Sequence, residues 1–328
     1  MNNKIFLTIV LTSLLLACTD DKELIPDNTP PVVSQNATYE VLVTEDLIYG
    51  EGLSHESLNS PTATTLPLYM DSYVPDNNSQ NRPLLVLIHG GGFSGGTKQQ
   101  EPLVDMANYY AARGFVVFSI DYRLRGNKGT IPQEWIDASS DIPAESIGQF
   151  YAIYPAHRDA KAALRWIVAN AENYNINTDY ITVGGGSAGA TTSIGVGVSD
   201  LADYKEEITA NQDPTLISTN YNQAYEVKTI LDFWGSDNSI EILELIYGYQ
   251  RFDQNIPSIF IAHGTEDTTV PYSNAEDLKA IYQANNADFV FYALEGRGHG
   301  AWGTTLDGES LSDLSFAYVL EVQNLIAE

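Results

Sequence analysis

The chain has 328 residues, of which 44% are hydrophobic and 18% are charged, so it can bury the core of one large globular domain. Its formal net charge of −27, from 43 acidic and 16 basic side chains, repels nucleic acid and anionic lipid surfaces. The composition excludes a wholly disordered chain and argues against a nucleic-acid partner, while the charge itself indicates a soluble, self-repelling surface.

The first residues predict a targeting segment. Lys4 precedes an apolar run over residues 5–17, which is too short to span a bilayer but has the length of a signal-peptide core. The run ends in "LLLAC", which resembles the bacterial lipobox, where the cysteine becomes the lipidated first residue of the mature protein. We interpret residues 1–17 as a lipoprotein signal peptide.

Cys18 is the only cysteine, so no disulfide can form within one chain. Its place at the end of the apolar run favours lipidation over an unpaired signal-peptide cysteine. Residues 18–36 are acidic and then proline-rich, which predicts a solvated tether, and the acidic part is similar to the export signal of surface lipoproteins in Bacteroidetes-type bacteria. We expect an exported lipoprotein, facing the periplasm or the cell surface, that contacts the membrane only through its lipid.

Residues 37–328 are predicted to form one domain in which strands and helices alternate. Residues 39–44 and 66–74 alternate as half-buried strands and form an antiparallel opening. Buried strands are then expected at the apolar runs 84–89, 115–120, 181–183, 229–233, 258–263 and 289–294, and helices at 101–113, 156–172 and 272–285. This rhythm predicts an α/β fold with a mostly parallel central sheet and helices on both faces.

Two long connections, 124–155 and 200–226, interrupt that rhythm and are candidate lids or walls of a binding site. The first contains Trp135, Phe150, Tyr151 and Tyr154, whose rings suit the faces of sugars or phenolic groups. Packing of these aromatics under a surface loop is the alternative.

The stretch "ITVGGGSAGA", residues 181–190, places Ser187 among small residues directly after a predicted strand. Gly185-x-Ser187-x-Gly189 is the pattern of a nucleophile elbow, a strained strand-to-helix turn that exposes a serine hydroxyl above a sheet. The alternative is a chance glycine-rich loop, but residues 188–198 are suitable for the helix that an elbow requires.

A serine nucleophile needs a base, and the base needs a partner that fixes its tautomer. Among five histidines, His299 lies in a glycine-rich loop after the last predicted strand, and Asp267 follows the strand before it. A surface-loop histidine and a turn-capping aspartate are the alternatives. The order Ser187, Asp267, His299 is the chain order of α/β-hydrolase triads, which favours the catalytic interpretation.

The loop "HGGGFSGG", residues 89–96, follows the strand at 84–88. Its glycines leave backbone N–H groups free to bind an oxyanion, so we expect Gly91, Gly92 and the amide of Ala188 to be the donors. A phosphate-binding loop is rejected because the Lys-Ser/Thr ending of a P-loop and the spacing of a dinucleotide fingerprint are missing.

Residues 60–305 resemble α/β-hydrolase esterases of the carboxylesterase and hormone-sensitive-lipase-like group, and are most similar to bacterial feruloyl and acetyl-xylan esterase-like members. The resemblance is carried by "RPLLVLIHGGGFSGGTK", "DYRL", "RDAKAALRWIVANAENYNI", "GGGSAGA", "HGTEDTTVP" and "GHGAW". It implies catalytic roles for Ser187, Asp267 and His299 and oxyanion binding by Gly91 and Gly92. Gly186 departs from the pattern, because relatives often carry a larger or acidic residue before the serine, and Arg123 is expected to hold a structural salt bridge.

These features together predict a serine esterase that forms a covalent acyl-enzyme on small acyl groups or carbohydrate-linked esters such as acetyl or feruloyl groups, with no metal or organic cofactor. A serine peptidase of the prolyl-oligopeptidase type shares the fold but normally has a large extra domain. A catalytically inactive surface-binding protein on the same scaffold is the other alternative. The oligomeric state is not predicted.

Overall fold

The computed structural model describes residues 29–328. The predicted signal peptide, Cys18 and the first part of the predicted tether lie outside these residues. No helix within the described range is both long enough and apolar enough to cross a membrane.

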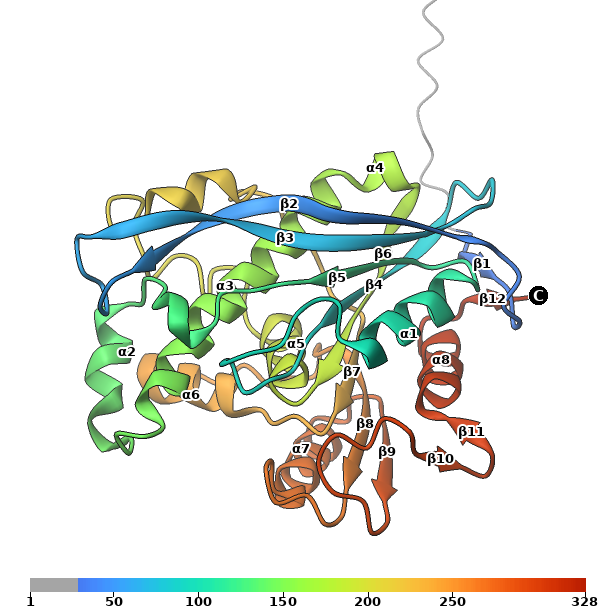
Figure 1. Ribbon diagram of the computed structural model, residues 1–328. Helices are drawn as coiled ribbons and strands as arrows, with labels where there is room; N and C mark the ends of the chain where they lie inside the picture. Colours follow the sequence, from blue (N-terminus) through green and yellow to red (C-terminus); the bar gives the residue numbers. More distant parts are fainter. Residues whose placement is uncertain (1–28) are drawn as a thin grey trace, which may run out of the picture.

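An eight-stranded sheet forms the centre of the molecule (Figure 1). Its strands are β2 (Val41–His55), β3 (Ala63–Pro75), β4 (Arg82–Ile88), β5 (Val116–Ile120), β6 (Ile176–Gly186), β7 (Thr229–Phe233), β8 (Ser258–Gly264) and β9 (Phe289–Leu294). In space they follow the order β2-β3-β5-β4-β6-β7-β8-β9. The β2–β3 and β3–β5 pairs are antiparallel and all later pairs are parallel, which confirms the predicted mostly parallel sheet.

Helices cover both faces of this sheet, because its central strands are apolar on both sides. Along β4, Leu85 and Leu87 join the core under α1 (Glu101–Ala111) and α8 (Leu311–Val322). Leu84, Val86 and Ile88 point to the other face. There they join the core formed with α3 (Ile147–Ala169), α5 (Ala188–Val198), α6 (Asn238–Tyr247) and α7 (Tyr272–Asn285).

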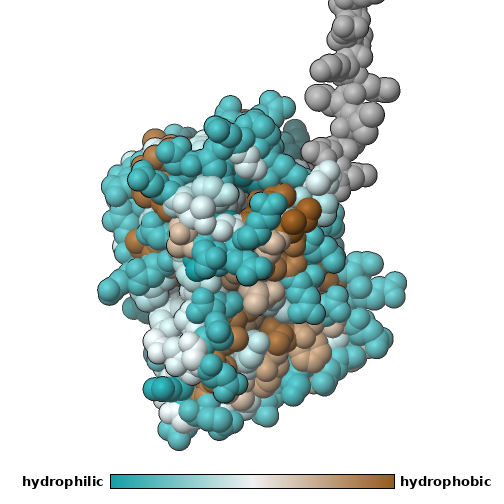
Figure 2. Space-filling view, turned by 90° about the vertical axis from the view of Figure 1, so that its right-hand side faces the viewer, coloured by the Kyte–Doolittle hydropathy of each residue, from teal (hydrophilic) through white to brown (hydrophobic). Residues whose placement is uncertain are grey.

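Short elements complete the described chain: β1 (Val32–Val33), α2 (Gln133–Ala138), α4 (Ala171–Tyr174), β10 (Thr305–Leu306), β11 (Glu309–Ser310) and β12 (Ile326–Ala327). Strand β1 pairs in parallel with β12 and so joins the two ends of the described chain. On the side of the molecule that carries β12 and α8, hydrophilic side chains cover most of the surface, with hydrophobic groups between them (Figure 2).

The connection predicted over residues 124–155 is largely helical. It contains α2, and α3 begins at Ile147 rather than at 156, so that Pro155 lies inside the helix. Proline normally disfavours a helix interior. Here Phe150, Ile153 and Tyr154 are buried in the core, and this packing outweighs the local preference. The second connection, 200–226, contains only a short 3₁₀ turn at Pro214–Ser218.

Candidate active site

Ser187 occupies a strained turn between β6 and α5. Its backbone dihedral angles are φ 58° and ψ −124°, a conformation that is costly for a residue with a side chain. A Cβ atom on Gly185 or Gly189 would lie 2.2 or 2.0 Å from the carbonyl oxygen of Ile88. Glycine is therefore required at both positions because the end of β4 passes directly against the turn.

The structure brings together the three side chains predicted from separate strands. His299, in the loop after β9, places its Nε2 2.9 Å from the Ser187 hydroxyl oxygen. Its Nδ1 lies 2.7 Å from Oδ2 of Asp267, which follows β8. Asp267 is buried and His299 is partly exposed, so the hydrogen-bonded chain runs from the protein interior to the Ser187 hydroxyl at the edge of a cavity.

The carboxylate of Asp267 is held on both oxygens. Burial alone would raise the pKa of Asp267, but the hydrogen bonds from His299 and from the N–H groups of Thr269 and Val270 lower it below its usual value. The two backbone N–H groups donate to Oδ1 at 2.8 and 3.0 Å, which leaves Oδ2 for the imidazole. An ionised Asp267 therefore selects the tautomer in which His299 carries its proton on Nδ1 and accepts on Nε2.

A second histidine lies beside this carboxylate. His263 is buried on β8, and its Nε2 donates to the carbonyl oxygen of Val270 at 2.9 Å and lies 3.4 Å from Oδ2 of Asp267. Burial lowers the pKa of His263, which keeps the ring neutral. His263 thus supports the loop that carries Asp267 and does not line the cavity at Ser187.

The loop after β4 curls over the turn at Ser187. Gly91 and Gly92 both have positive φ, at 113° and 58°, and a Cβ on Gly91 would lie 2.2 Å from the carbonyl oxygen of Gly95. The N–H groups of Gly91 and Gly92 have no hydrogen-bond acceptor within residues 29–328. Ala188 is the first residue of α5, so its N–H group likewise has no acceptor within the helix. All three residues line the cavity at Ser187, as oxyanion donors must.

The cavity at Ser187 has a volume of about 790 Å³, within the usual range for small-molecule sites. The lining residues that the sequence analysis did not predict include Gln149 from α3, Trp234 after β7 and Trp302 after His299. No local sequence signal marks Gln149 or Trp234, because they come from segments far apart in the chain. Trp302 is part of the quoted motif "GHGAW", but its place in the cavity was not predicted.

Two tryptophans explain the unusual glycine before the serine. The rings of Trp234 and Trp302 pack edge to face with centroids 4.7 Å apart. A Cβ on Gly186 would lie 2.6 Å from Cζ2 of Trp302 and 3.3 Å from Nε1 of Trp234. The space that a larger residue at this position would take is already filled by indole rings.

The four aromatic residues proposed to contact substrate have different environments. Trp135 and Tyr154 are fully buried and pack against Tyr204, so the prediction is wrong for these two. Phe150 lines the cavity at Ser187, whereas Tyr151, on the other side of α3, lines a second cavity. A helix turns its side chains through about 100° per residue, which sends neighbours to different surfaces.

Two other polar residues of the sequence motifs have structural roles. Arg123 is buried and pairs with Asp159 at 2.7 Å, as expected. The ring of His89 stacks on Tyr122 with centroids 4.2 Å apart, and its Nδ1 lies 2.7 Å from the carbonyl oxygen of Gly90. In the part of the chain that the structure describes, no group of three or more His, Cys, Asp or Glu side chains is arranged to hold a metal ion.

Comparison with known families and structures identifies the family and supports the fold. A family model described as BD-FAE matches residues 70–142 and 149–245, more than half of the chain. The matched residues include the glycine loop and Ser187 but not Asp267 or His299. Thermogutta terrifontis esterase 2 phosphorylated by paraoxon is similar in fold, with a TM-score of 0.58 and 21% identity, over 85% of this chain and 96% of that one. A truncated form of a carbohydrate esterase from gut microbiota has a TM-score of 0.55 and 19% identity, over 90% of this chain and 100% of that one.

Curated relatives by sequence include several esterases. Esterase LipC of Mycobacterium tuberculosis is 23% identical over 90% of this chain and 68% of its own length. Para-nitrobenzyl esterase of Bacillus subtilis is 31% identical, but the match covers 37% of this chain and only 22% of that protein. Endo-1,4-beta-xylanase B of Butyrivibrio fibrisolvens is 24% identical over 68% of this chain and 33% of its own length. The chain thus spans about two thirds of the first of these relatives and a third or less of the other two.

Proposed function

Since the chain belongs to the BD-FAE family of α/β-hydrolase esterases, we propose that it hydrolyses carboxylic esters with Ser187 as nucleophile, His299 as general base and Asp267 as the partner of the histidine. The observation that carries this proposal is the continuous hydrogen-bonded chain of 2.9 Å and 2.7 Å through the three side chains. It ends at a serine held in a strained turn, in a cavity open to a small molecule.

The proposed reaction has two halves. Nε2 of His299 takes the proton of the Ser187 hydroxyl as the oxygen attacks the ester carbonyl carbon. The N–H groups of Gly91, Gly92 and Ala188 stabilise the negative charge that develops on the carbonyl oxygen. The intermediate collapses to an acyl-serine and releases the alcohol, which takes the proton from His299.

A water molecule then repeats the attack on the acyl-serine, again giving its proton to His299, and the acid leaves as Ser187 recovers its proton. Asp267 stays ionised throughout and stabilises the imidazolium form of His299. Its lowered pKa supports this role, because the carboxylate is then retained at neutral pH.

For the substrate we propose short acyl groups or carbohydrate-linked esters such as acetyl or feruloyl groups. The similarity to a carbohydrate esterase from gut microbiota supports this class, as does the partial similarity to a xylanase. The cavity also fits it: Phe150, Trp234 and Trp302 offer flat apolar walls, and Gln149 offers a polar amide beside the glycine loop.

The dependence of turnover on acyl length tests this substrate class. We expect kcat/KM for p-nitrophenyl esters from two to sixteen carbons to peak at acetyl or butyryl and then fall, with release of acetate or ferulate from acetylated or feruloylated xylan. A lipase would instead gain up to about 0.8 kcal/mol with each buried methylene. A maximum at long chains, with no acid released from xylan, would contradict the substrate class and leave the three catalytic roles standing.

We also propose that the protein is exported and anchored through a lipid on Cys18, with residues 18–36 as the tether. The support is the apolar run that ends at this cysteine, in a sequence that resembles the bacterial lipobox. Cys18→Ala is expected to move the protein from the membrane fraction to a soluble or unprocessed pool. Unchanged processing and membrane association would refute lipidation at this residue.

A further inference from the structure

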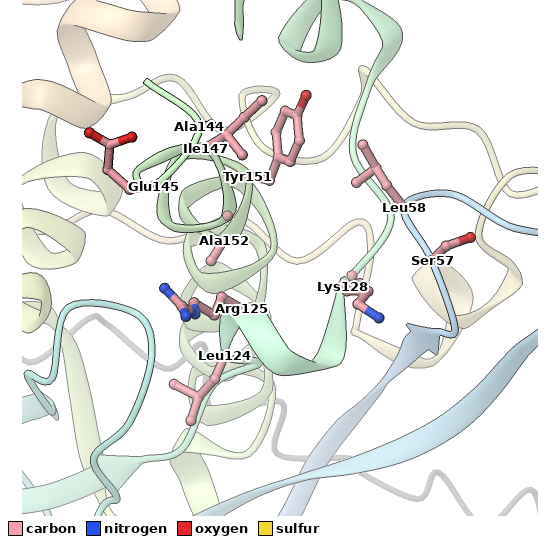
Figure 3. A pocket seen from close by; sticks show the side chains of 12 residues that line it. Ser57, Leu58, Leu124, Arg125, Lys128, Ala144, Glu145, Ile147, Tyr151 and Ala152 are labelled. Atoms are coloured by element: carbon pink, nitrogen blue, oxygen red, sulfur yellow. The ribbon is translucent and has the colours of Figure 1, made fainter. Parts of the chain in front are cut away.

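A second cavity lies against the first turns of α3 (Figure 3). The α3 residues that line it differ from those that line the cavity at Ser187. The second cavity has a volume of about 430 Å³ and shares no lining residue with the cavity at Ser187. Tyr151 and Ala152 of α3 form one wall, Arg125 comes from the turn after β5, and Leu58 comes from the β2–β3 connection. Three segments far apart in sequence thus enclose one hollow beside the active site.

The charged groups of this cavity favour an anion. Arg125 is exposed and lines the cavity, and its guanidinium makes no hydrogen bond or ion pair with any residue in the described range. Lys128 also lines the cavity, and its ammonium donates to the carbonyl oxygen of Glu56 without a carboxylate partner. Glu145 is the one acidic residue of the lining, so the two cations leave a formal local charge of +1.

Arg125 has no carboxylate partner among the described residues, although the chain has a net charge of −27. Three of the five buried arginines pair with an aspartate: Arg123, Arg158 and Arg251. Arg125 instead offers a planar fork of N–H donors, which matches a carboxylate with two parallel hydrogen bonds. Repulsion from the distant acidic surface falls off over about 8 Å at physiological ionic strength, so the local charges dominate inside the cavity.

The remaining lining favours an apolar body for the ligand. Leu58, Leu124 and Ile147 supply aliphatic surface, and the Tyr151 ring is fixed by a 2.7 Å hydrogen bond between its hydroxyl and that of Ser139. A volume of about 430 Å³ is at the small end of the range for ligand sites. A monocyclic acid fits this size and pattern better than a long saccharide, which would need more polar partners.

We infer that this cavity binds an organic carboxylate with an apolar or aromatic body. This inference goes beyond the proposed function, since it assigns a separate site that takes no part in bond breaking. The ligand belongs to the chemical class of acids that ester hydrolysis releases, so the site is suited to sense the product next to the helix that also lines the cavity at Ser187.

Calorimetric titration tests the inference, with 4-hydroxycinnamate as the probe and its neutral amide as the matched control ligand. The active site is first blocked with a fluorophosphonate, and the block is checked by mass. We expect the carboxylate to bind and the amide to bind about tenfold or more weakly, because a charge-assisted arginine–carboxylate contact is lost. Arg125→Gln should reduce carboxylate binding to the level of the amide, whereas Lys279→Gln, which removes a positive charge on α7, should change nothing.

Gly148 provides an independent variant. It lines the cavity, and a Cβ placed on it would meet no atom within 4 Å, so the side chain of Gly148→Leu starts in open space at the cavity, and the change raises helix propensity. We expect this folded variant to lose binding of both probes while it still hydrolyses p-nitrophenyl acetate. Four results would each overturn the inference. The first two are undetectable binding of the carboxylate and equal binding of the acid and the amide. The other two are binding of a sugar probe, xylobiose, in place of the carboxylate, and undiminished binding of the carboxylate to Gly148→Leu. Failure of the fluorophosphonate to react counts against the proposed function instead, and the Gly148→Leu comparison still reports on this cavity.

Discussion

Replacing Asp267 with asparagine is expected to abolish most of the activity through the tautomer of His299. In the structure Oδ1 of Asp267 accepts two backbone N–H groups, from Thr269 and Val270. An asparagine at this position must keep its oxygen on that side, because an amide NH₂ there would face two donors. Its NH₂ group therefore points at Nδ1 of His299, which lies 2.7 Å from Oδ2 in the native chain.

A donor at this place reverses the imidazole. Nδ1 then accepts, the ring proton moves to Nε2, and Nε2 can no longer take the proton of Ser187. An aspartate-to-asparagine change of this kind in a Ser-His-Asp triad lowers kcat by about 10⁴, which corresponds to roughly 5.5 kcal/mol of transition-state stabilisation. Binding of the ground-state substrate does not involve the tautomer, so KM is expected to change little.

The assay is steady-state hydrolysis of p-nitrophenyl acetate at pH 7.5 by Asp267→Asn and by Asp253→Asn. The second variant is a matched control, since Asp253 also accepts a backbone N–H in a turn, from Asn255, but is exposed and forms no part of the cavity at Ser187. We expect near-native kcat for Asp253→Asn. A loss of less than tenfold in Asp267→Asn, with native circular dichroism, would refute the tautomer reasoning.

Three further predictions concern packing and buried charge. Gly186→Ala is expected to lower the free energy of unfolding, measured with urea, by about 1–3 kcal/mol, because the new Cβ would overlap Trp302. Adding Trp302→Phe should relieve part of that loss. If the losses of the two single variants simply add in the double variant, the overlap is not the cause. Asp232 is buried, its Oδ2 has no partner in the described part of the chain, and burial raises its pKa to about 7. The folded state then binds an extra proton between pH 3.8 and about 7, so stability falls as pH rises through this window, by up to about 3 kcal/mol from pH 5 to pH 7. Asp232→Asn should show a smaller fall between pH 5 and pH 8, and an identical fall in both proteins would exclude the raised pKa. Arg123→Gln strands the buried carboxylate of Asp159 and should cost about 3–5 kcal/mol in the same assay, whereas a change below about 1 kcal/mol would show that the pair is dispensable.

The central sheet and the three polar residues at its edge could be predicted because their signals are local. Apolar runs of strand length mark β4, β5, β7, β8 and β9 with small errors at their ends. Glycines mark the turn at Ser187. The carboxyl ends of parallel strands meet at one edge of a sheet, so Asp267 and His299 could be predicted to lie near Ser187 from their positions after β8 and β9. Helix α7 (Tyr272–Asn285) has the predicted bounds.

What the sequence did not reveal depends on contacts between distant segments. Helix α3 begins before Pro155 because its first turns are buried against the core, and a proline in the sequence does not show that burial. The same contacts bury Trp135 and Tyr154 while leaving Phe150 and Tyr151 at two different cavities. Aromatic residues in one stretch of sequence look alike, and only the packing of the helix separates their environments.

Mass spectrometry of the protein treated with a fluorophosphonate gives the most direct test of Ser187 as the nucleophile. We predict one adduct per chain, located on Ser187 by fragmentation of the peptide that spans β6 and α5, and no adduct on Ser187→Ala. Esterase activity is expected to fall in proportion to labelling. An adduct on another residue, or an unlabelled protein that still hydrolyses p-nitrophenyl acetate, would contradict the proposed mechanism.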